Sequence, residues 1–311
     1  MKRIAFVFPG QGSQAVGMLD AFAGEPAVQD VLARAGQALG EDLGGLVAGG
    51  PAEQLNLTVN TQPAMLAAGV AVYRAWLAAG GAVPAIMAGH SLGEYSALAA
   101  AEAIPLEAAT RLVRFRAQAM QEAVPAGSGG MAAILGLDDE QVAQACVEAA
   151  QGEVVEPVNF NAPSQVVIAG HAAAVGRACE AARRLGAKRA LALPVSAPFH
   201  CSLLAPAAHR LRERLRQEPV ATPRVPVINN IDVAVEVEPE RIRDALARQA
   251  AGPVRWAEII RRMAAEGVTH VVECGPGKVL AGLTRRIAPD LESFALTDPS
   301  AVDEALARLR E

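Results

Sequence analysis

The sequence predicts an α/β fold in which a smaller unit is inserted into a larger one. Residues 85–88 form a short apolar run, residues 89–93 a glycine-rich turn, and residues 94–101 are rich in helix formers. Strand, sharp turn and helix in succession are typical of an α/β unit. Residues 131–195 follow the order strand, helix, two strands, helix and strand, which is the split βαβ, or ferredoxin-like, arrangement.

Hydrophobic periodicity and turn residues predict the individual elements. We expect strands at residues 4–8, 85–88, 131–135, 154–160, 165–169, 189–195, 225–230 and 269–273, and helices at 106–121, 138–150, 172–185, 239–250 and 254–266. Glycines precede the split βαβ pattern and prolines follow it. We therefore predict a larger unit from residues 1–126 and 199–311, with an inserted unit from residues 127–198.

Composition excludes several classes of protein. The 311 residues carry a net charge of −5, whereas a protein that binds nucleic-acid phosphates needs a basic excess. No apolar run is long enough to cross a membrane, and the apolar run at residues 4–8 is too short for a secretion signal. The four cysteines have no C-x-x-C spacing, so we expect neither a disulfide framework nor a metal site, and we expect a cytoplasmic setting.

The segment Gly89-His90-Ser91-Leu92-Gly93 has the pattern of a nucleophile elbow. It lies between an expected strand and an expected helix, the context that holds the serine out at the apex of the turn. The N–H of Leu92 starts the helix, where backbone donors are unpaired and negative charge is favoured. Serine needs a base, and of the five histidines we select His200, because it lies where the inserted unit ends and clefts prefer such boundaries.

Three other functions compete with this interpretation. An α/β-hydrolase would share the elbow, but it usually carries an upstream oxyanion motif of the HGGG type, and here that place holds Gly10-Gln11-Gly12. The same glycines allow a dinucleotide-binding interpretation, which needs a second strand where residues 31–40 favour a helix. A non-catalytic scaffold would leave the elbow and His200 unexplained.

Segments spread over nearly the whole chain resemble the malonyl-CoA:acyl carrier protein transacylase family. They are Gly10-Gln11-Gly12-Ser13-Gln14, Gly89 to Tyr95, Met120 to Pro125, Asn159-Phe160-Asn161, Gln165 to Gly170 and Gly275-Pro276-Gly277-Lys278. The resemblance implies a hydrolase-like α/β core with a ferredoxin-like insertion. It also implies transfer of malonyl from malonyl-CoA to acyl carrier protein without a cofactor. Free-standing polyketide acyltransferases share these motifs, so that pathway is the alternative.

The resemblance also implies roles for individual residues. Ser91 would carry the malonyl ester and His200 would be its base. The backbone N–H groups of Gln11 and Leu92 would form the oxyanion hole. A backbone carbonyl, that of Gln249, would orient the histidine in place of a carboxylate.

Three residues are expected to bind the substrate. Arg116 shares an apolar helical stripe with Leu112 and Met120, so it is either a buried ion-pair partner or faces a cleft. The resemblance favours a guanidinium that grips the malonyl carboxylate. Phe199 narrows the pocket and favours malonyl over a bulkier acyl group, and Asn161 would line the channel for coenzyme A and for the phosphopantetheine arm.

Overall fold

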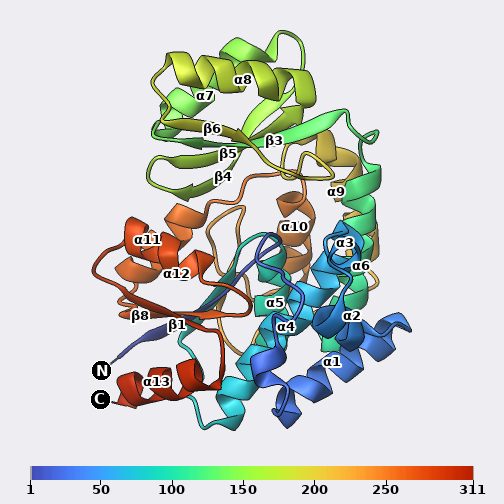
Figure 1. Cartoon of the computed structure of the whole chain (residues 1–311), viewed down its shortest axis with the longest axis vertical. Coiled ribbons are helices and arrows are strands. Elements are labelled where there is room, and N and C mark those ends of the chain that lie inside the picture. Colours follow the sequence, from blue (N-terminus) through green and yellow to red (C-terminus); the bar gives the residue numbers. More distant parts are fainter. Residues whose placement is uncertain (1, 311) are drawn as a thin grey trace.

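The computed structural model describes residues 2–310 and confirms the predicted α/β class. Its larger sheet has five parallel strands in the order β7-β2-β1-β8-β9. The bounds of these strands are β1 (Ile4–Phe8), β2 (Ile86–Gly89), β7 (Val227–Ile228), β8 (His270–Cys274) and β9 (Glu292–Leu296). Figure 1 shows this sheet in the lower half of the molecule and a second sheet above it.

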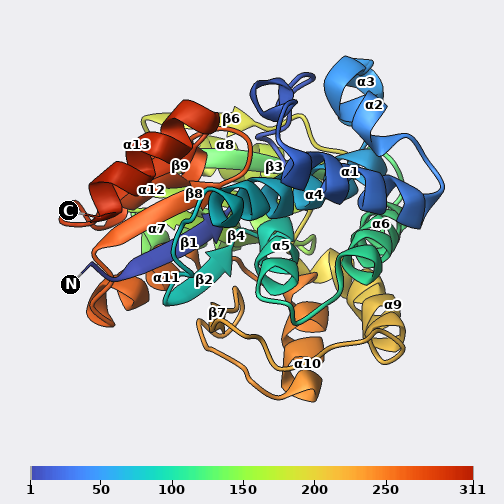
Figure 2. The same ribbon diagram turned by 90° about the horizontal axis from the view of Figure 1, so that it is seen from below.

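Helices cover both faces of the parallel sheet, and β1 shows why. Phe6 and Phe8 belong to one buried apolar cluster, whereas Ala5 and Val7 belong to another, as alternating side chains of a fully buried strand must. The helices outside the second sheet are α1 (Pro26–Leu39), α2 (Leu43–Gly49), α3 (Ala52–Leu55), α4 (Thr58–Ala78), α5 (Leu92–Ala100), α6 (Leu106–Glu122), α9 (Ala205–Leu215), α10 (Pro239–Gln249), α11 (Trp256–Ala265), α12 (Val279–Ile287) and α13 (Pro299–Arg310). Figure 2 shows α4 and α5 beside β1 and β2.

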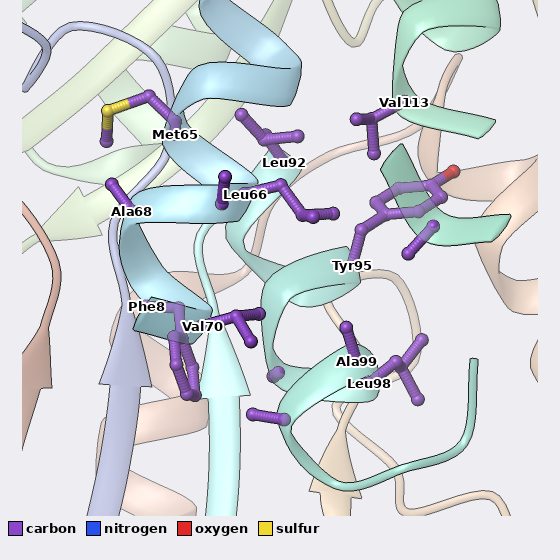
Figure 3. Close-up of a cluster of buried hydrophobic side chains, with 14 of the residues drawn as sticks. Phe8, Met65, Leu66, Ala68, Val70, Leu92, Tyr95, Leu98, Ala99 and Val113 are labelled. Atoms are coloured by element: carbon purple, nitrogen blue, oxygen red, sulfur yellow. The ribbon is translucent and has the colours of Figure 1, made fainter. Parts of the chain in front are cut away.

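The core between α4, α5 and the sheet supports the turn at residue 91. Phe8 of β1, Leu66 of α4 and Leu98 of α5 are almost entirely buried, and Figure 3 shows the side chains of this cluster meeting between the three elements. Full burial of each such side chain contributes about 1.5–3 kcal/mol. The start of α5 is therefore fixed by packing rather than by helix propensity alone.

The second sheet is antiparallel, with strands in the order β4-β5-β3-β6. Its elements are β3 (Gly129–Leu135), α7 (Asp139–Ala150), β4 (Val155–Ala162), β5 (Gln165–His171), α8 (Ala172–Arg184) and β6 (Arg189–Ala192). Strand β5 lies between β3 and β4 and runs antiparallel to both, which is the split βαβ order that the sequence predicts. Figure 1 shows α7 and α8 on the side of this sheet away from the parallel sheet.

Backbone hydrogen bonds join the two sheets' units along β4. Phe160 N–H donates to Val254 O at 3.0 Å, and Val254 N–H donates to Val158 O at 2.8 Å. Arg286 adds a bond from Nη2 to Pro163 O at 3.0 Å. Because these bonds flank Asn161, the end of β4 is held against the residues that precede α11.

The structure shortens some expected elements and adds others. Strand β6 ends at Ala192 rather than at residue 195, ahead of Pro194. Strand β7 is only two residues long, because Asn229 begins a turn that its N–H closes by donating to Ala234 O.

The structure also decides against one alternative function. Residues 31–39 lie within α1, so the dinucleotide-binding alternative lacks its second strand and is wrong. No helix within residues 2–310 has the length and apolarity to cross a membrane.

Candidate active site

Ser91 occupies a strained turn between β2 and α5. Its φ is 53° and its ψ −109°, a backbone region that non-glycine residues rarely adopt. A Cβ on Gly89 would lie 1.9 Å from the carbonyl of Gly93, and one on Gly93 would lie 2.0 Å from Phe8 O. Only glycine therefore fits at either position, as a nucleophile elbow requires.

Asn230 fastens the elbow from the end of a neighbouring strand. Its Oδ1 accepts the Ser91 N–H at 2.7 Å, and its Nδ2 donates to Gly89 O at 2.7 Å. Asn230 is fully buried and follows β7 by two residues. One amide side chain thus satisfies two backbone groups that the sharp turn leaves without partners in the sheet.

His200 faces the serine with its ring already oriented. The distance from Ser91 Oγ to His200 Nε2 is 2.6 Å, and that from His200 Nδ1 to Gln249 O is 2.9 Å. With Nδ1–H donating to the carbonyl, Nε2 is free to accept the serine proton. Burial, and second the charge of Arg116, lower the pKa of His200 to about 3, so the imidazole is neutral near pH 7 and competent as a base.

Two backbone amides lie beside the serine in the same cavity wall. Leu92 is the first residue of α5, and Gln11 lies in the loop after β1. Within residues 2–310, neither amide N–H has a hydrogen-bond acceptor. The loop is held by Gln11 Nε2, which donates to Thr58 Oγ1 at 3.2 Å, and by the Gly12 N–H, which donates to Gln14 Oε1 at 2.7 Å.

Arg116 places a buried positive charge next to the serine. Its Nη2 donates to Ser91 Oγ at 3.1 Å and to Gln249 Oε1 at 3.0 Å, while Nη1 donates to Gln62 Oε1 at 3.0 Å. The side chain is only 2% exposed, and it stacks on Tyr95 with its Cζ 5.3 Å from the ring centroid. All of its described hydrogen-bond partners are neutral. The buried Glu94 carboxyl interacts with the guanidinium through its charge, without a direct hydrogen bond.

These residues line one cavity of about 610 Å³, a volume typical of small-molecule sites. The larger unit contributes Gln11, Gln62, Ser91, Leu92, Arg116, Phe199 and His200, and the antiparallel unit with its return segment contributes Met131, Asn159, Leu193, Pro194 and Val195. Asn161 is not part of this wall. Its Oδ1 lies 2.8 Å from His90 Nε2, so it braces the residue before Ser91.

Sequence reasoning missed Asn159, Gln62 and Asn230. Asn159 and Asn161 belong to one short motif, and the sequence did not indicate which of the two lines the cavity. Gln62 is a polar residue near the start of a long, largely apolar helix. Asn230 follows a strand at the carboxyl end of the sheet, where sites gather in α/β proteins. The sequence shows both positions, but neither position indicates which group the side chain hydrogen-bonds.

The site combines a serine with a neutral base, two free amide donors and one buried guanidinium. This set can form and break an ester at Ser91 while it holds a negatively charged group. Residues 2–310 contain no group of three or more histidine, cysteine or acidic side chains placed to hold a metal ion. The chemistry that the arrangement supports is acyl transfer by a serine.

Known proteins match the chain over almost its full length. The family model described as an acyl transferase domain matches residues 5–292. The malonyl CoA-acyl carrier protein transacylase of Escherichia coli K12 is 57% identical over 307 residues, which cover 98% of this chain and 99% of that protein.

Solved structures agree with these matches. An acyl-carrier-protein S-malonyltransferase from Burkholderia pseudomallei 1710b is 63% identical with a TM-score of 0.97, covering 98% of this chain and 99% of that one. A malonyl-transacylase in complex with its holo type II polyketide synthase acyl-carrier protein is 51% identical with a TM-score of 0.97, covering 99% and 100%.

Replacing Gly93 by alanine should destroy the elbow. The added Cβ would meet the Phe8 carbonyl at 2.0 Å, so the start of α5 must move away from β1. We expect at least about a 100-fold loss in the rate of Ser91 acylation, since shifts of about 1 Å in reacting groups have this effect. Gly282→Ala is the control, because its Cβ would meet nothing within 4 Å; equal rates in the two variants would contradict the argument.

The ring of His200 should not titrate between pH 5 and pH 8. Burial holds its pKa near 3, so the imidazole stays neutral throughout this range. The expected result is a constant chemical shift of the His200 ring protons by NMR, assigned with a His200→Gln variant. A midpoint near the usual pKa of about 6.5 would show that the ring is solvated or paired in a way that the structure does not contain.

Proposed function

The chain belongs to the acyl transferase family, among the malonyl CoA-acyl carrier protein transacylases, and on that premise we propose that it transfers malonyl from malonyl-CoA to the phosphopantetheine thiol of an acyl carrier protein. One observation carries the choice of malonyl. The Arg116 guanidinium lies 3.1 Å from the Ser91 hydroxyl, so an acyl group on Ser91 places its far end within reach of a buried positive charge. A free carboxylate at that end satisfies the charge.

The first half of the proposed cycle forms the ester. Ser91 Oγ attacks the thioester carbonyl while His200 Nε2 accepts the hydroxyl proton. The N–H groups of Gln11 and Leu92 donate to the developing oxyanion, an interaction that typically contributes about 10²–10³ in rate per donor. The carbon–sulfur bond then breaks, and His200 returns its proton to the leaving coenzyme A thiolate.

The second half reverses these steps with another thiol. The carrier's pantetheine thiol gives its proton to His200 and attacks the Ser91 ester. The tetrahedral intermediate collapses with cleavage of the ester bond, and Ser91 Oγ recovers the proton from His200. We propose that Gln249 O keeps the ring in place through both halves, that Phe199 narrows the acyl end of the cavity, and that no cofactor takes part.

The inserted unit is proposed to complete the channel for both thiol substrates. We propose the division into residues 1–126 with 199–311 and residues 127–198, because every strand of the antiparallel sheet lies between Gly129 and Ala192. Met131, Asn159 and Leu193 then reach the cavity from the inserted unit. Asn161 acts on the elbow through His90 rather than on the substrate.

We assign the reaction to fatty acid elongation in the cytoplasm, where the four cysteines, all buried and free in the described chain, suit a reducing setting. A polyketide carrier is the second candidate, because one of the similar structures holds a polyketide acyl-carrier protein. Rates measured with a fatty acid carrier and a polyketide carrier would separate these two. A higher kcat/KM for the polyketide carrier would reverse the assignment.

Mixing the protein with malonyl-CoA should add one malonyl group to Ser91. Intact-mass analysis should detect the single addition, which should disappear when holo acyl carrier protein is supplied and should be absent in Ser91→Ala. The ester forms because His200 is neutral and placed 2.6 Å from the hydroxyl. A wild-type protein that stays unmodified would disprove the proposed ester.

Arg116→Ala should lower kcat/KM for malonyl-CoA by roughly 10–150-fold, because a hydrogen bond to a charged group contributes about 1.5–3 kcal/mol. Acetyl-CoA, which has no carboxylate, should lose less, so that the preference for malonyl narrows. Arg111→Ala is the control, since Arg111 is an exposed arginine on the same helix. Equal losses for malonyl and acetyl would show that Arg116 does not choose the substrate.

A further inference from the structure

Glu94 is a buried carboxyl that the mechanism above does not use. It lies in the first turn of α5, three residues after Ser91, and is 2% exposed. The other residues of this helix are apolar, small or uncharged. Burial of a carboxyl in such a place is costly unless its oxygens are hydrogen-bonded, so its partners indicate its role.

Both described partners of Glu94 hold the catalytic residues. Glu94 Oε2 accepts the backbone N–H of Asn230 at 2.8 Å and the Nε2 of Gln249 at 2.9 Å. Asn230 is the residue that binds the Ser91 N–H and Gly89 O. One carboxylate oxygen therefore joins two segments that are far apart in the sequence to the helix that carries the nucleophile.

Gln249 extends this connection to three sides of the site. Its Nε2 also donates to Ser91 O at 2.9 Å, its Oε1 accepts from Arg116 Nη2 at 3.0 Å, and its backbone O binds His200 Nδ1 at 2.9 Å. Because Oε1 must accept from Arg116, Nε2 must point the other way, and Glu94 and Ser91 O are the acceptors there. Arg116 on one side and the carboxylate of Glu94 on the other thus fix which way the amide of Gln249 faces.

We propose that Glu94 is a positioning residue: its carboxylate holds Gln249 and Asn230 so that Ser91, His200 and Arg116 are aligned for acyl transfer. This inference rests on the proposed function, since it assumes that Ser91 is acylated. Glu94 does not touch the substrate, and it acts only through Asn230 and Gln249. Bonds to a carboxylate are about twice as strong as bonds to a neutral acceptor, which explains why a carboxyl stands here despite its burial.

The test compares Glu94→Gln and Glu94→Ala with the wild type in single-turnover acylation by malonyl-CoA. Glu94→Gln keeps the shape but weakens both bonds, and we expect about a tenfold lower acylation rate constant; Glu94→Ala removes the acceptor, and we expect about a 100-fold loss. The concentration of malonyl-CoA at half saturation should change less than about threefold. Reaction of Ser91 with a small uncharged phosphonate should slow by the same factor, since the nucleophile itself is misaligned.

Glu273→Gln is the matched control. Glu273 on β8 is also fully buried, and burial raises its pKa to about 7 as it does for Glu94. Its Oε2 accepts the Ala281 N–H at 2.8 Å, and it is not among the residues that line the cavity. We expect its acylation rate to stay within about twofold of the wild type. A Glu94→Gln protein that is folded and equally fast would overturn the inference, whereas a wild type that is never acylated would overturn the proposed function instead.

The pH dependence of the wild-type acylation rate gives a second test, which does not depend on whether a substituted protein folds. Burial raises the pKa of Glu94 to about 7, so the carboxylate forms, and the acylation rate should increase, as pH rises through 7.

The other charged groups around Glu94 do not produce this dependence. Arg116 stays protonated, and Arg248 lowers the pKa of Asp232. His200 is neutral here, and Glu236 shares a small cavity with Glu94. An acylation rate constant that is flat from pH 5.5 to 8.5 would contradict the inference.

Discussion

The close approach of Gly89 and Gly93 is the constraint on which the site depends. The two residues leave no room for a Cβ on either, and the turn between them forces Ser91 to a φ of 53°. Strain of this kind costs of order 1–3 kcal/mol and persists only where the surroundings over-determine it. Here they do, because β1 and α4 pack against the start of α5 (Figure 3) and Asn230 binds both sides of the turn. His200 also has a positive φ, 69°, and its ring is held by the carbonyl of Gln249.

Charge and burial act together at the serine. The described hydrogen-bond partners of Arg116 are neutral, and the Glu94 carboxyl lies near enough to raise its pKa. The positive charge of Arg116 is one of the two largest reasons that the pKa of His200 falls. A protonated histidine beside a guanidinium would be doubly unfavourable, so the base remains neutral and ready to accept a proton. In the proposed function, the same guanidinium would meet the acyl group that the serine carries. Arg116 would then both keep the base neutral and offer the counter-charge for a carboxylated substrate.

Much of this fold and part of the site could be predicted from the sequence. The elbow follows from glycine spacing between a strand and a helix, and the order of the antiparallel unit follows from alternating strand and helix patterns, so both were accessible. The family resemblance gave the contact between His200 and the carbonyl of Gln249. The side-chain hydrogen bonds of Asn230 and Gln249 could not be predicted, because both residues are distant in sequence from Ser91 and only the folded chain brings them to Glu94. The length of β7 was also overestimated, because the turn at Asn229 that ends it depends on a hydrogen bond to Ala234.

The position of the antiparallel sheet, which we propose as an inserted unit, helps to explain why such a site transfers rather than hydrolyses. A neutral histidine next to a serine ester would activate water as readily as a thiol, so the base cannot choose between them. The choice must come from what reaches the ester. Met131, Leu193, Val195 and Phe199 contribute apolar side chains to the cavity that Gln11 also lines. An apolar lining favours an extended thiol arm that displaces water over water itself. With the proposed division of the chain, acyl transfer would therefore depend on both units, because the larger one would supply the reacting groups and the inserted one would help to exclude the competing nucleophile.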